Sequence, residues 1–346
     1  MIYVHICPAD KFMPGFIDFI RQHFEFHEHQ FWIYGDSQRY DIPEGDNIFH
    51  LSGKIKNRLL FIWSLLRCRK IFFHSFHGLK QALLLLLNPW CIRKSFWFIW
   101  GGDLYQYQIN HKGVKWCLTE FLRRCTIRGM AGIVTYIRGD YLHACQQYRC
   151  SVRWYECLMY TSNIFNAHAD NAPVTANERP LNILVGNSAL PTNNHVVAFD
   201  ILKKYACHDI NVICPLSYGI PDYAHQVERV GRHLFGKRFN AITKFMPASE
   251  YLILLRNIDI AVFSHNRQQA MGNTIALLGE GKTVFLNPGT TQWDFFNQHQ
   301  IHVRDLHSFS LSQLSVSEVE NNKQKVGRYF SQENLLRQLS ILFQCK

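Results

Sequence analysis

The chain has 346 residues, which is enough for about two domains of ordinary size. Hydrophobic residues make up 47% of it and charged residues 18%, a composition that excludes a disordered, collagen-like or coiled-coil protein. The formal net charge of +11 indicates an anionic partner: nucleic acid, a phosphorylated substrate or lipid headgroups.

Short apolar runs alternate with longer amphipathic ones in the first half of the chain, a pattern typical of α/β layers with a mostly parallel sheet. This pattern predicts strands at residues 2–6, 31–34, 48–51, 71–74, 95–100, 132–135 and 153–156. Between them it predicts helices at residues 15–27, 58–69, 79–87, 112–123 and 139–147. We therefore expect a doubly wound first domain over residues 1–162.

A polar stretch at residues 163–180, rich in Asn and Pro, is interpreted as an interdomain linker. A second series of alternating strands and helices follows over residues 181–325, and residues 326–346 are predicted to form a helical tail. Two Rossmann-like domains joined by a linker predict an α/β protein with its active site in the cleft between the domains.

The first domain contains a strongly basic block. No acidic residue occurs between Asp46 and Asp103, where the basic residues are Lys54, Lys56, Arg58, Arg67, Arg69, Lys70, Lys80, Arg93 and Lys94. Residues 54–70 combine basic ends with an apolar centre, which suits either a membrane surface or an ordinary helix packed on a sheet. The apolar stretches are too short to predict a membrane-spanning helix. Scattered cysteines and the absence of a signal-like N-terminus favour a cytoplasmic protein.

Two turns of the second domain are suited to phosphate. Gly186, Asn187 and Ser188 follow the strand predicted at residues 181–185, where a glycine lets the backbone approach a ligand. The segment 267–274 follows the strand predicted at residues 258–264 and contributes Arg267, Gln268, Gln269, Gly272, Asn273 and Thr274. An arginine beside a helix N-terminus is a good diphosphate site. Plain turns with polar helix caps remain the alternative for both segments.

A third motif lies at the end of a predicted strand of the first domain. Asp103 follows Gly101 and Gly102 there, and His74 and His77 stand at the end of the preceding strand. An acid at a strand end is placed to act as a general base, with either histidine as a second candidate. Asp103 capping the following helix, and a histidine satisfied within the core, are the structural alternatives.

The sequence contains no motif for a bound metal or for the common nucleotide-binding loops. It has no D-x-D, G-x-G-x-x-G, Walker, G-x-S-x-G or H-E-x-x-H pattern. We therefore expect no metal and no cofactor, so that helix N-termini, backbone N–H groups and arginine would neutralise a diphosphate leaving group.

Specific strings within residues 72–287 resemble the bacterial TDP-N-acetylfucosamine:lipid II N-acetylfucosaminyltransferases of glycosyltransferase family 56. These strings are residues 96–105, residues 183–188 with Asn194 and His195, and residues 267–274. The sequence departs from the family pattern at Met271, in the short loop at residues 217–220 and over the first 70 residues.

The resemblance implies a GT-B fold and a donor in which dTDP carries a 4-amino-4,6-dideoxy sugar, of the 4-acetamido-4,6-dideoxygalactose type. It implies a polyprenyl-diphosphate-linked saccharide as acceptor, at the cytoplasmic face of the bacterial inner membrane, in enterobacterial common antigen or O-antigen synthesis. The basic first domain would contact the anionic membrane surface, and no nucleic acid is expected. Residues 186–188 and 267–274 would hold the donor diphosphate. Pro215 and Tyr218 would lie near the base and ribose, with Tyr218 stacking on thymine.

Two other functions remain open on the residues alone. A nucleotide-sugar epimerase of GT-B fold would consume the donor without an acceptor. A non-enzymatic basic module would bind polyanions or membrane through the basic block and would not interact with dTDP.

Overall fold

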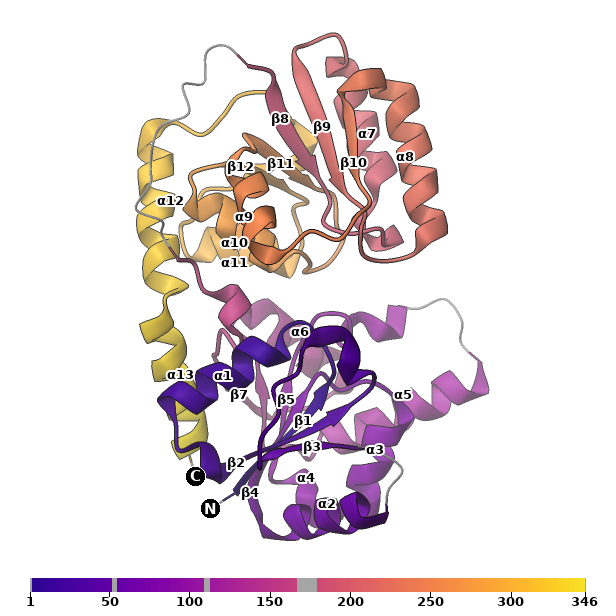
Figure 1. Ribbon diagram of the computed structural model, residues 1–346, viewed down its shortest axis with the longest axis vertical. Coiled ribbons are helices and arrows are strands. Elements are labelled where there is room, and N and C mark those ends of the chain that lie inside the picture. Colours follow the sequence, from indigo (N-terminus) through magenta and orange to yellow (C-terminus); the bar gives the residue numbers. More distant parts are fainter. Residues whose placement is uncertain (1, 52–54, 109–112, 167–178, 346) are drawn as a thin grey trace. The chain divides into compact units, whose positions relative to one another are not determined.

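The computed structural model describes residues 2–51, 55–108, 113–166 and 179–345. The chain divides into two compact units, residues 1–164 with 332–346 and residues 165–331 (Figure 1). Most of the linker expected at residues 163–180 falls on residues 167–178, which lie outside the described residues.

The first unit is built on a seven-stranded parallel sheet in the order β3-β2-β1-β4-β5-β6-β7. Its strands are β1 (Ile2–Pro8), β2 (His29–Tyr34), β3 (Ile48–His50), β4 (Cys68–His74), β5 (Ser95–Phe98), β6 (Gly132–Val134) and β7 (Arg153–Tyr155). The central strands are apolar and buried almost throughout, as expected for a parallel sheet covered on both faces. The strand order reverses between β1 and β4, the place where doubly wound sheets bind ligands.

Helices cover this sheet: α1 (Met13–His23), α2 (Ile55–Arg67), α3 (Gly78–Leu87), α4 (Pro89–Ile92), α5 (Val114–Ile127), α6 (Arg138–Tyr148) and α13 (Gln332–Gln344). One core cluster joins Val4, Ile71, Phe73 and Trp97 of the strands to Leu65 of α2. Because β4 and β5 are hydrogen-bonded parallel neighbours, their carboxyl ends lie together at one edge of the sheet.

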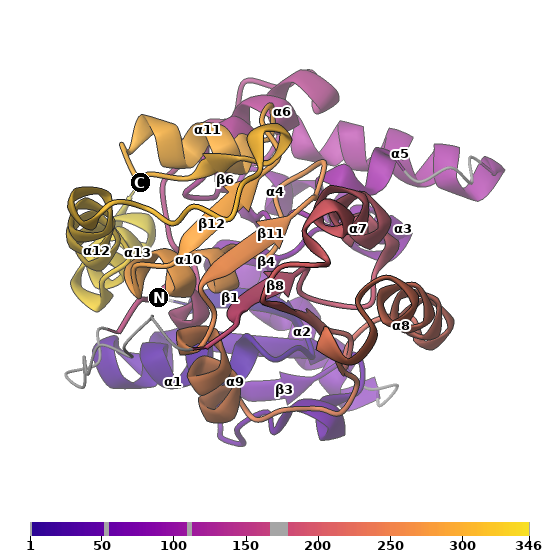
Figure 2. The same ribbon diagram turned by 90° about the horizontal axis from the view of Figure 1, so that it is seen from above.

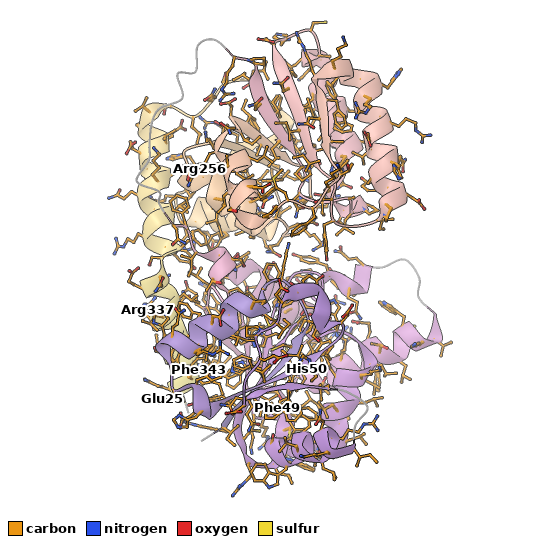
Figure 3. The ribbon with its side chains drawn as sticks, in the orientation of Figure 1. Glu25, Phe49, His50, Arg256, Arg337 and Phe343 are labelled. Atoms are coloured by element: carbon orange, nitrogen blue, oxygen red, sulfur yellow. The ribbon has the colours of Figure 1, made fainter. Side chains whose placement is uncertain are left out.

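Helix α13 was expected in a separate tail, but it packs on the first unit. It runs beside the end of α1, and its Phe343 ring packs against the rings of Tyr3 and His29 (Figures 1 and 3). Lys70, which we counted as part of the basic surface, is buried. Its Nζ donates hydrogen bonds to the carbonyl oxygens of Leu342 and Phe343, at 2.6 and 3.1 Å. Lys70 therefore binds the end of α13 and does not belong to the exposed basic surface.

The second unit is a six-stranded parallel sheet in the order β10-β9-β8-β11-β12-β13. Its strands are β8 (Leu181–Val185), β9 (Ile210–Pro215), β10 (Phe239–Ile242), β11 (Ile260–Phe263), β12 (Thr283–Leu286) and β13 (Arg304–Asp305). The order is again that of a Rossmann fold, and it reverses between β8 and β11.

The helices of this unit are α7 (His195–Leu202), α8 (Pro221–Phe235), α9 (Ala248–Arg256), α10 (Met271–Gly279), α11 (Thr291–Gln298) and α12 (Val316–Tyr329). Helices α7 and α8 lie side by side (Figure 2). The core formed by Val185, Val212, Phe199 and Val262 holds β8 and β11 against α7. The α/β class and two Rossmann-like units predicted from the pattern are thus confirmed.

Exposed apolar side chains gather on α2, which buries Phe61 and Leu65 toward the sheet. The same helix exposes Ile55, Leu59, Ile62, Trp63 and Leu66 to solvent. Within the described part of the chain, no helix has the length and apolar character needed to cross a membrane.

Candidate functional site

The two phosphate-suited turns of the second unit meet at the edge where the strand order reverses. Gly186 follows β8 and residues 264–270 follow β11, and these two parallel strands are hydrogen-bonded neighbours. The carboxyl ends of neighbouring parallel strands lie at the same sheet edge, so their loops are adjacent. The sequence prediction that both motifs converge here is confirmed by their direct contacts.

The backbone at Gly186 requires a glycine. Its φ is +68°, and a β-carbon on it would lie 2.6 Å from Nε2 of His195 and 3.0 Å from Oδ1 of Asn193. Its own N–H belongs to the sheet, donating to the carbonyl oxygen of Val262 at 3.1 Å. The turn can therefore pass close to the start of α7 only because position 186 has no side chain.

Asn193, which sequence reasoning missed, joins the two turns. Its Oδ1 accepts the N–H of Asn187 at 2.9 Å and a hydrogen bond from Nε2 of His265, also at 2.9 Å. Its Nδ2 donates to the carbonyl oxygen of Ser188 at 2.8 Å and to the Ser188 hydroxyl at 3.0 Å. Asn193 and Ser188 are buried, so Ser188 acts within this network and Asn187 is the half-buried member of the turn.

A side-chain hydrogen bond connects the motifs directly. Nε2 of Gln269 donates to Oδ1 of Asn187 at 3.1 Å, and the Gln269 N–H donates to Oε1 of Gln292 at 3.3 Å. Gln292, a second residue missed from the sequence, also donates from Nε2 to the Thr274 hydroxyl at 3.0 Å. Residues 186–188 and 267–274 are thereby held as one surface.

Helix α10 begins at this surface without a side-chain cap. Its N-cap residue, Ala270, has φ of 58° and carries no side-chain acceptor, so the first-turn N–H groups of α10 lack a side-chain cap. Gly272 and Asn273 are half-buried in this first turn, and Nδ2 of Asn273 donates to the Tyr251 hydroxyl at 2.7 Å. Thr274 is buried and donates to the carbonyl oxygen of Ala270. An uncapped helix start attracts anions.

The charges around the surface also favour an anion. Arg267 lies half-buried beside α10, with Nη1 donating to the carbonyl oxygen of Gln268 at 3.3 Å. Between Asp259 and Glu280 the sequence contains no acidic residue, nor does it between Glu178 and Asp200. The edge therefore presents a cation and helix N–H groups without a neighbouring carboxylate in either motif.

Three buried polar atoms at this edge have no hydrogen-bond partner among the described residues: Nε2 of His195, Nδ1 of His265 and Oε1 of Gln269. Burial lowers the pKa of His195 to about 4, and burial with the nearby Arg267 charge lowers that of His265 to about 3. Both imidazoles are therefore neutral at neutral pH. Buried polar groups are usually satisfied by the protein, by ordered water or by a ligand, so these three atoms are candidates for such contacts.

Pro215 and Tyr218, expected near the base and ribose, lie at the end of the neighbouring strand β9. Pro215 is buried, whereas the Tyr218 side chain is 50% exposed. The Tyr218 carbonyl oxygen accepts the Ala189 N–H at 2.6 Å, which fixes this loop next to Ser188. Of the two residues, Tyr218 is the one whose side chain can meet a ligand.

In the first unit, Asp103 is fully buried and its carboxylate accepts four hydrogen bonds. Oδ1 accepts the N–H groups of Trp100 and Leu104, each at 2.9 Å. Oδ2 accepts the Phe76 N–H at 2.8 Å and Trp97 Nε1–H at 2.6 Å. A carboxylate engaged in this way has neither access nor a free acceptor position for a substrate proton, so this geometry contradicts Asp103 as the general base.

His74 is likewise inside the core. Its Nδ1 lies 2.7 Å from the Tyr160 hydroxyl and its Nε2 3.0 Å from Nδ1 of His5. His5 in turn contacts Nδ1 of His29 at 3.0 Å. Burial lowers the pKa of His74 to about 3. Both nitrogens of His74 are occupied, which leaves it no role in taking a proton from a substrate.

His77 is the one of the three candidates whose side chain is exposed. It precedes α3 at the carboxyl end of β4, and its Nδ1 is hydrogen-bonded to the Ser75 hydroxyl. Desolvation of the imidazole by the surrounding protein lowers the pKa of His77. The Arg123 charge lowers this pKa further, whereas the Asp103 charge raises it. His77 is thus a neutral, accessible imidazole at the sheet edge.

The described residues include no group of three His, Cys, Asp or Glu side chains close enough together to hold a metal ion.

Comparison with solved structures identifies the fold. The chain is similar to a glycosyltransferase from Rickettsia africae, with a TM-score of 0.66 and 14% identity over 99% of this chain and 97% of that one. WaaG, a glycosyltransferase involved in lipopolysaccharide biosynthesis, matches with a TM-score of 0.62 and 10% identity over 100% of both chains. Sucrose-phosphate synthase from Thermosynechococcus elongatus matches with a TM-score of 0.65 and 10% identity over 99% of this chain and 98% of that one. This is the GT-B fold of glycosyltransferases.

A family model agrees with the fold and with the strings singled out in the sequence. It is described as 4-alpha-L-fucosyltransferase glycosyl transferase group 56, and it matches residues 48–332, including both phosphate-suited turns and the edge that carries Asp103 and His77. Since the match spans most of the 346 residues, the chain belongs to glycosyl transferase group 56, the 4-alpha-L-fucosyltransferase family, and is a glycosyltransferase.

Proposed function

We propose that this glycosyltransferase transfers a 4-amino-4,6-dideoxy sugar, of the 4-acetamido-4,6-dideoxygalactose type, from a dTDP donor to a polyprenyl-diphosphate-linked saccharide. The reaction would need neither metal nor cofactor. It would take place at the cytoplasmic face of a bacterial inner membrane, in enterobacterial common antigen or O-antigen synthesis. The sugar, the acceptor and the pathway follow from the resemblance to family 56.

The observation that carries the donor half of this proposal is the hydrogen bond between Gln269 and Asn187. It joins the Gly186 turn to the start of α10, so that this turn, Arg267 and the first-turn N–H groups of α10 belong to one surface. A departing diphosphate is stabilised by such fixed donors as negative charge develops on it. This arrangement supports a leaving group neutralised by the protein itself.

The acceptor half is supported by the surface of α2. Its apolar residues Leu59, Trp63 and Leu66 are 63%, 46% and 56% exposed, and Lys56, Arg58 and Arg67 are exposed on the same helix. The Arg67 guanidinium lies over the Trp63 ring, 4.5 Å from its centre. Exposed apolar side chains among basic ones suit the headgroup region of an anionic bilayer, where a polyprenyl acceptor is held.

The donor is tested by calorimetric titration of the purified chain with dTDP, UDP, GDP and CMP, with EDTA present throughout. We expect dTDP to bind most tightly and EDTA to have no effect. Arg267→Ala should weaken dTDP binding by about tenfold or more, because a charge-assisted hydrogen bond contributes roughly 1.5–3 kcal/mol. Arg229→Ala, which removes an exposed arginine of α8, is the matched control and should bind as the wild type does.

The outcomes separate the parts of the proposal. Tighter binding of UDP or GDP would contradict the dTDP-linked sugar and keep the reaction type. Binding that disappears with EDTA would contradict the metal-independent mechanism. If no nucleotide binds, the donor site at residues 186–188 and 267–274 is wrong.

A further inference from the structure

The turn between β4 and α3 holds Ser75 in a left-handed conformation, with φ of 73°. A serine rarely adopts this conformation, and it persists only where its surroundings fix it. Three hydrogen bonds do so: the Ser75 N–H donates to the Phe98 carbonyl oxygen at 3.0 Å, Gln81 Nε2 donates to the Ser75 carbonyl oxygen at 3.2 Å, and the Phe76 N–H donates to Asp103 at 2.8 Å. The buried carboxylate therefore holds a turn that carries His77.

This turn places one nitrogen of His77 against the protein. Ser75 is 1% exposed and its hydroxyl contacts Nδ1 of His77, whereas the His77 side chain is exposed. If Nδ1–H donates to the Ser75 oxygen, Nε2 carries the lone pair and can meet a substrate. A histidine oriented through one nitrogen by a buried acceptor is the usual arrangement of a general base.

The charges around His77 suit the same role. Burial, which has the largest effect, and the Arg123 guanidinium of α5 lower its pKa, while the Asp103 carboxylate, from the turn after β5, raises it. The net lowering keeps the imidazole neutral at neutral pH. The nearby carboxylate also stabilises the imidazolium once a proton has been taken up.

We propose that His77 is the general base of the transfer, that Ser75 orients it, and that Asp103 is a positioning residue that holds the turn. In this step the acceptor hydroxyl gives its proton to Nε2 of His77 while its oxygen forms a bond to the anomeric carbon. The bond from that carbon to the diphosphate oxygen breaks, and the electron pair leaves with the nucleoside diphosphate. The proposal rests on the function proposed above.

The first test replaces His77 with alanine and supplies imidazole in solution. The assay measures dTDP release from dTDP-4-acetamido-4,6-dideoxygalactose in the presence of the lipid extract of cells that lack this protein, in which the acceptor accumulates. We expect kcat to fall by about 10²- to 10⁴-fold, the range of general base catalysis, with dTDP binding unchanged. Added imidazole should restore part of the rate, in proportion to its unprotonated fraction.

The second test isolates the Ser75 hydroxyl. In Ser75→Gly the left-handed backbone is relieved and only the hydrogen-bond partner of Nδ1 is lost. We expect unchanged thermal stability, a kcat lowered by about ten- to a hundredfold, and a shifted acid limb in the pH profile of kcat/KM. The matched control is His233→Gln, which removes an exposed histidine of α8 in the second unit and should leave all three values unchanged.

The results distinguish this inference from the proposed function. A wild-type protein that releases no dTDP with the extract contradicts the proposed function, and the inference falls with it. A wild-type protein that transfers, together with a His77→Ala variant that retains full activity or loses activity without imidazole rescue, overturns His77 as the base and leaves the proposed function standing. A Ser75→Gly variant with the wild-type pH profile overturns the orienting role of Ser75.

Discussion

The α-carbon of Gly186 faces the imidazole of His195 so closely that a β-carbon added there would lie 2.6 Å from Nε2. This approach brings the turn after β8 against the first residue of α7, and a glycine is the only residue that permits it. The same Nε2 is a buried atom with no hydrogen-bond partner among the described residues.

We expect Gly186→Ala to lower the free energy of unfolding by about 2–4 kcal/mol, because overpacking and a positive φ each carry a cost. Its dTDP affinity should fall as well. Gly289→Ala is the matched control: its φ is +79°, but a β-carbon there meets nothing within 4 Å, so it reports the backbone cost alone. Equal urea midpoints for the two variants, with wild-type dTDP affinity in Gly186→Ala, would show that the contact with His195 is unimportant.

Asp103→Asn should destabilise the protein even though it changes one atom. The carboxylate accepts two hydrogen bonds at each oxygen, and an amide nitrogen in place of either oxygen would face two N–H donors. We expect the free energy of unfolding to fall by about 3 kcal/mol, since buried donors lose their acceptor. Turnover should fall with it, while dTDP binding to the second unit stays intact.

Urea unfolding and dTDP titration of the same sample check this prediction. Asp18→Asn, at an exposed aspartate paired with Arg21, is the control and should change stability by less than about 1 kcal/mol. An Asp103→Asn variant as stable as the wild type would contradict the inference that the hydrogen bonds of the Asp103 carboxylate stabilise this part of the fold.

Acid should destabilise the fold well above the pH at which most carboxyl groups titrate. His5, His29 and His74 form one buried chain, and burial lowers the pKa of His29 to about 4 and that of His74 to about 3. The unfolded chain takes up protons near pH 6.5, whereas these folded imidazoles stay neutral until far lower pH. Stability is therefore full above about pH 7 and decreases as pH falls from 6.5 toward 4.

Within that window, each such histidine lowers the free energy of unfolding by about 1.4 kcal/mol for every pH unit of acidification. The measurement is the urea midpoint at pH 7.5, 6.5, 5.5 and 4.5. His225→Gln, which removes an exposed histidine of α8, should leave the slope unchanged. A midpoint that is the same at pH 7.5 and pH 4.5 would show that the imidazole chain is protonated in the folded state.

Much of the fold could be predicted because strands buried in a parallel sheet appear in the sequence as continuous apolar runs. Helix α12 was missed, although Ser315 and Glu318 form a capping box that the sequence displays. Strand β13 has two residues, too few for any periodic signal. The helix expected at residues 112–123 is α5 (Val114–Ile127), and residues 109–112 lie outside the described residues.

Part of the candidate site could also be predicted, because the order of strands and loops shows which residues follow the strand ends. The strand-end positions of Gly186 and Gln269 follow from the order of strands and loops, so their convergence could be expected. The four hydrogen bonds that occupy the Asp103 carboxylate could not be expected, because two of the donors come from Phe76 after β4 and from Trp97 within β5. Asn193 and His265 were missed for the same reason, since only the folded chain brings their side chains together.

The exposed apolar residues of α2 predict binding to anionic vesicles. Leu66 is 56% exposed on a helix that also exposes Lys56, Arg58 and Arg67. Leu66→Glu places a carboxylate where a leucine would enter the headgroup region, so we expect binding to vesicles with one quarter anionic lipid to weaken by about tenfold or more. Cosedimentation at 50 and 300 mM salt measures this, and higher salt should weaken wild-type binding because part of the attraction is electrostatic.

Helix α9 of the second unit provides a matched control for that substitution. Ile253 is also 56% exposed, so Ile253→Glu makes the same chemical change at equal exposure. If α2 is the contacting surface, Ile253→Glu binds vesicles as the wild type does and Leu66→Glu does not. Equal losses in both variants would mean that the added negative charge weakens binding wherever it is placed, and the apolar face of α2 would then have no specific part in membrane contact.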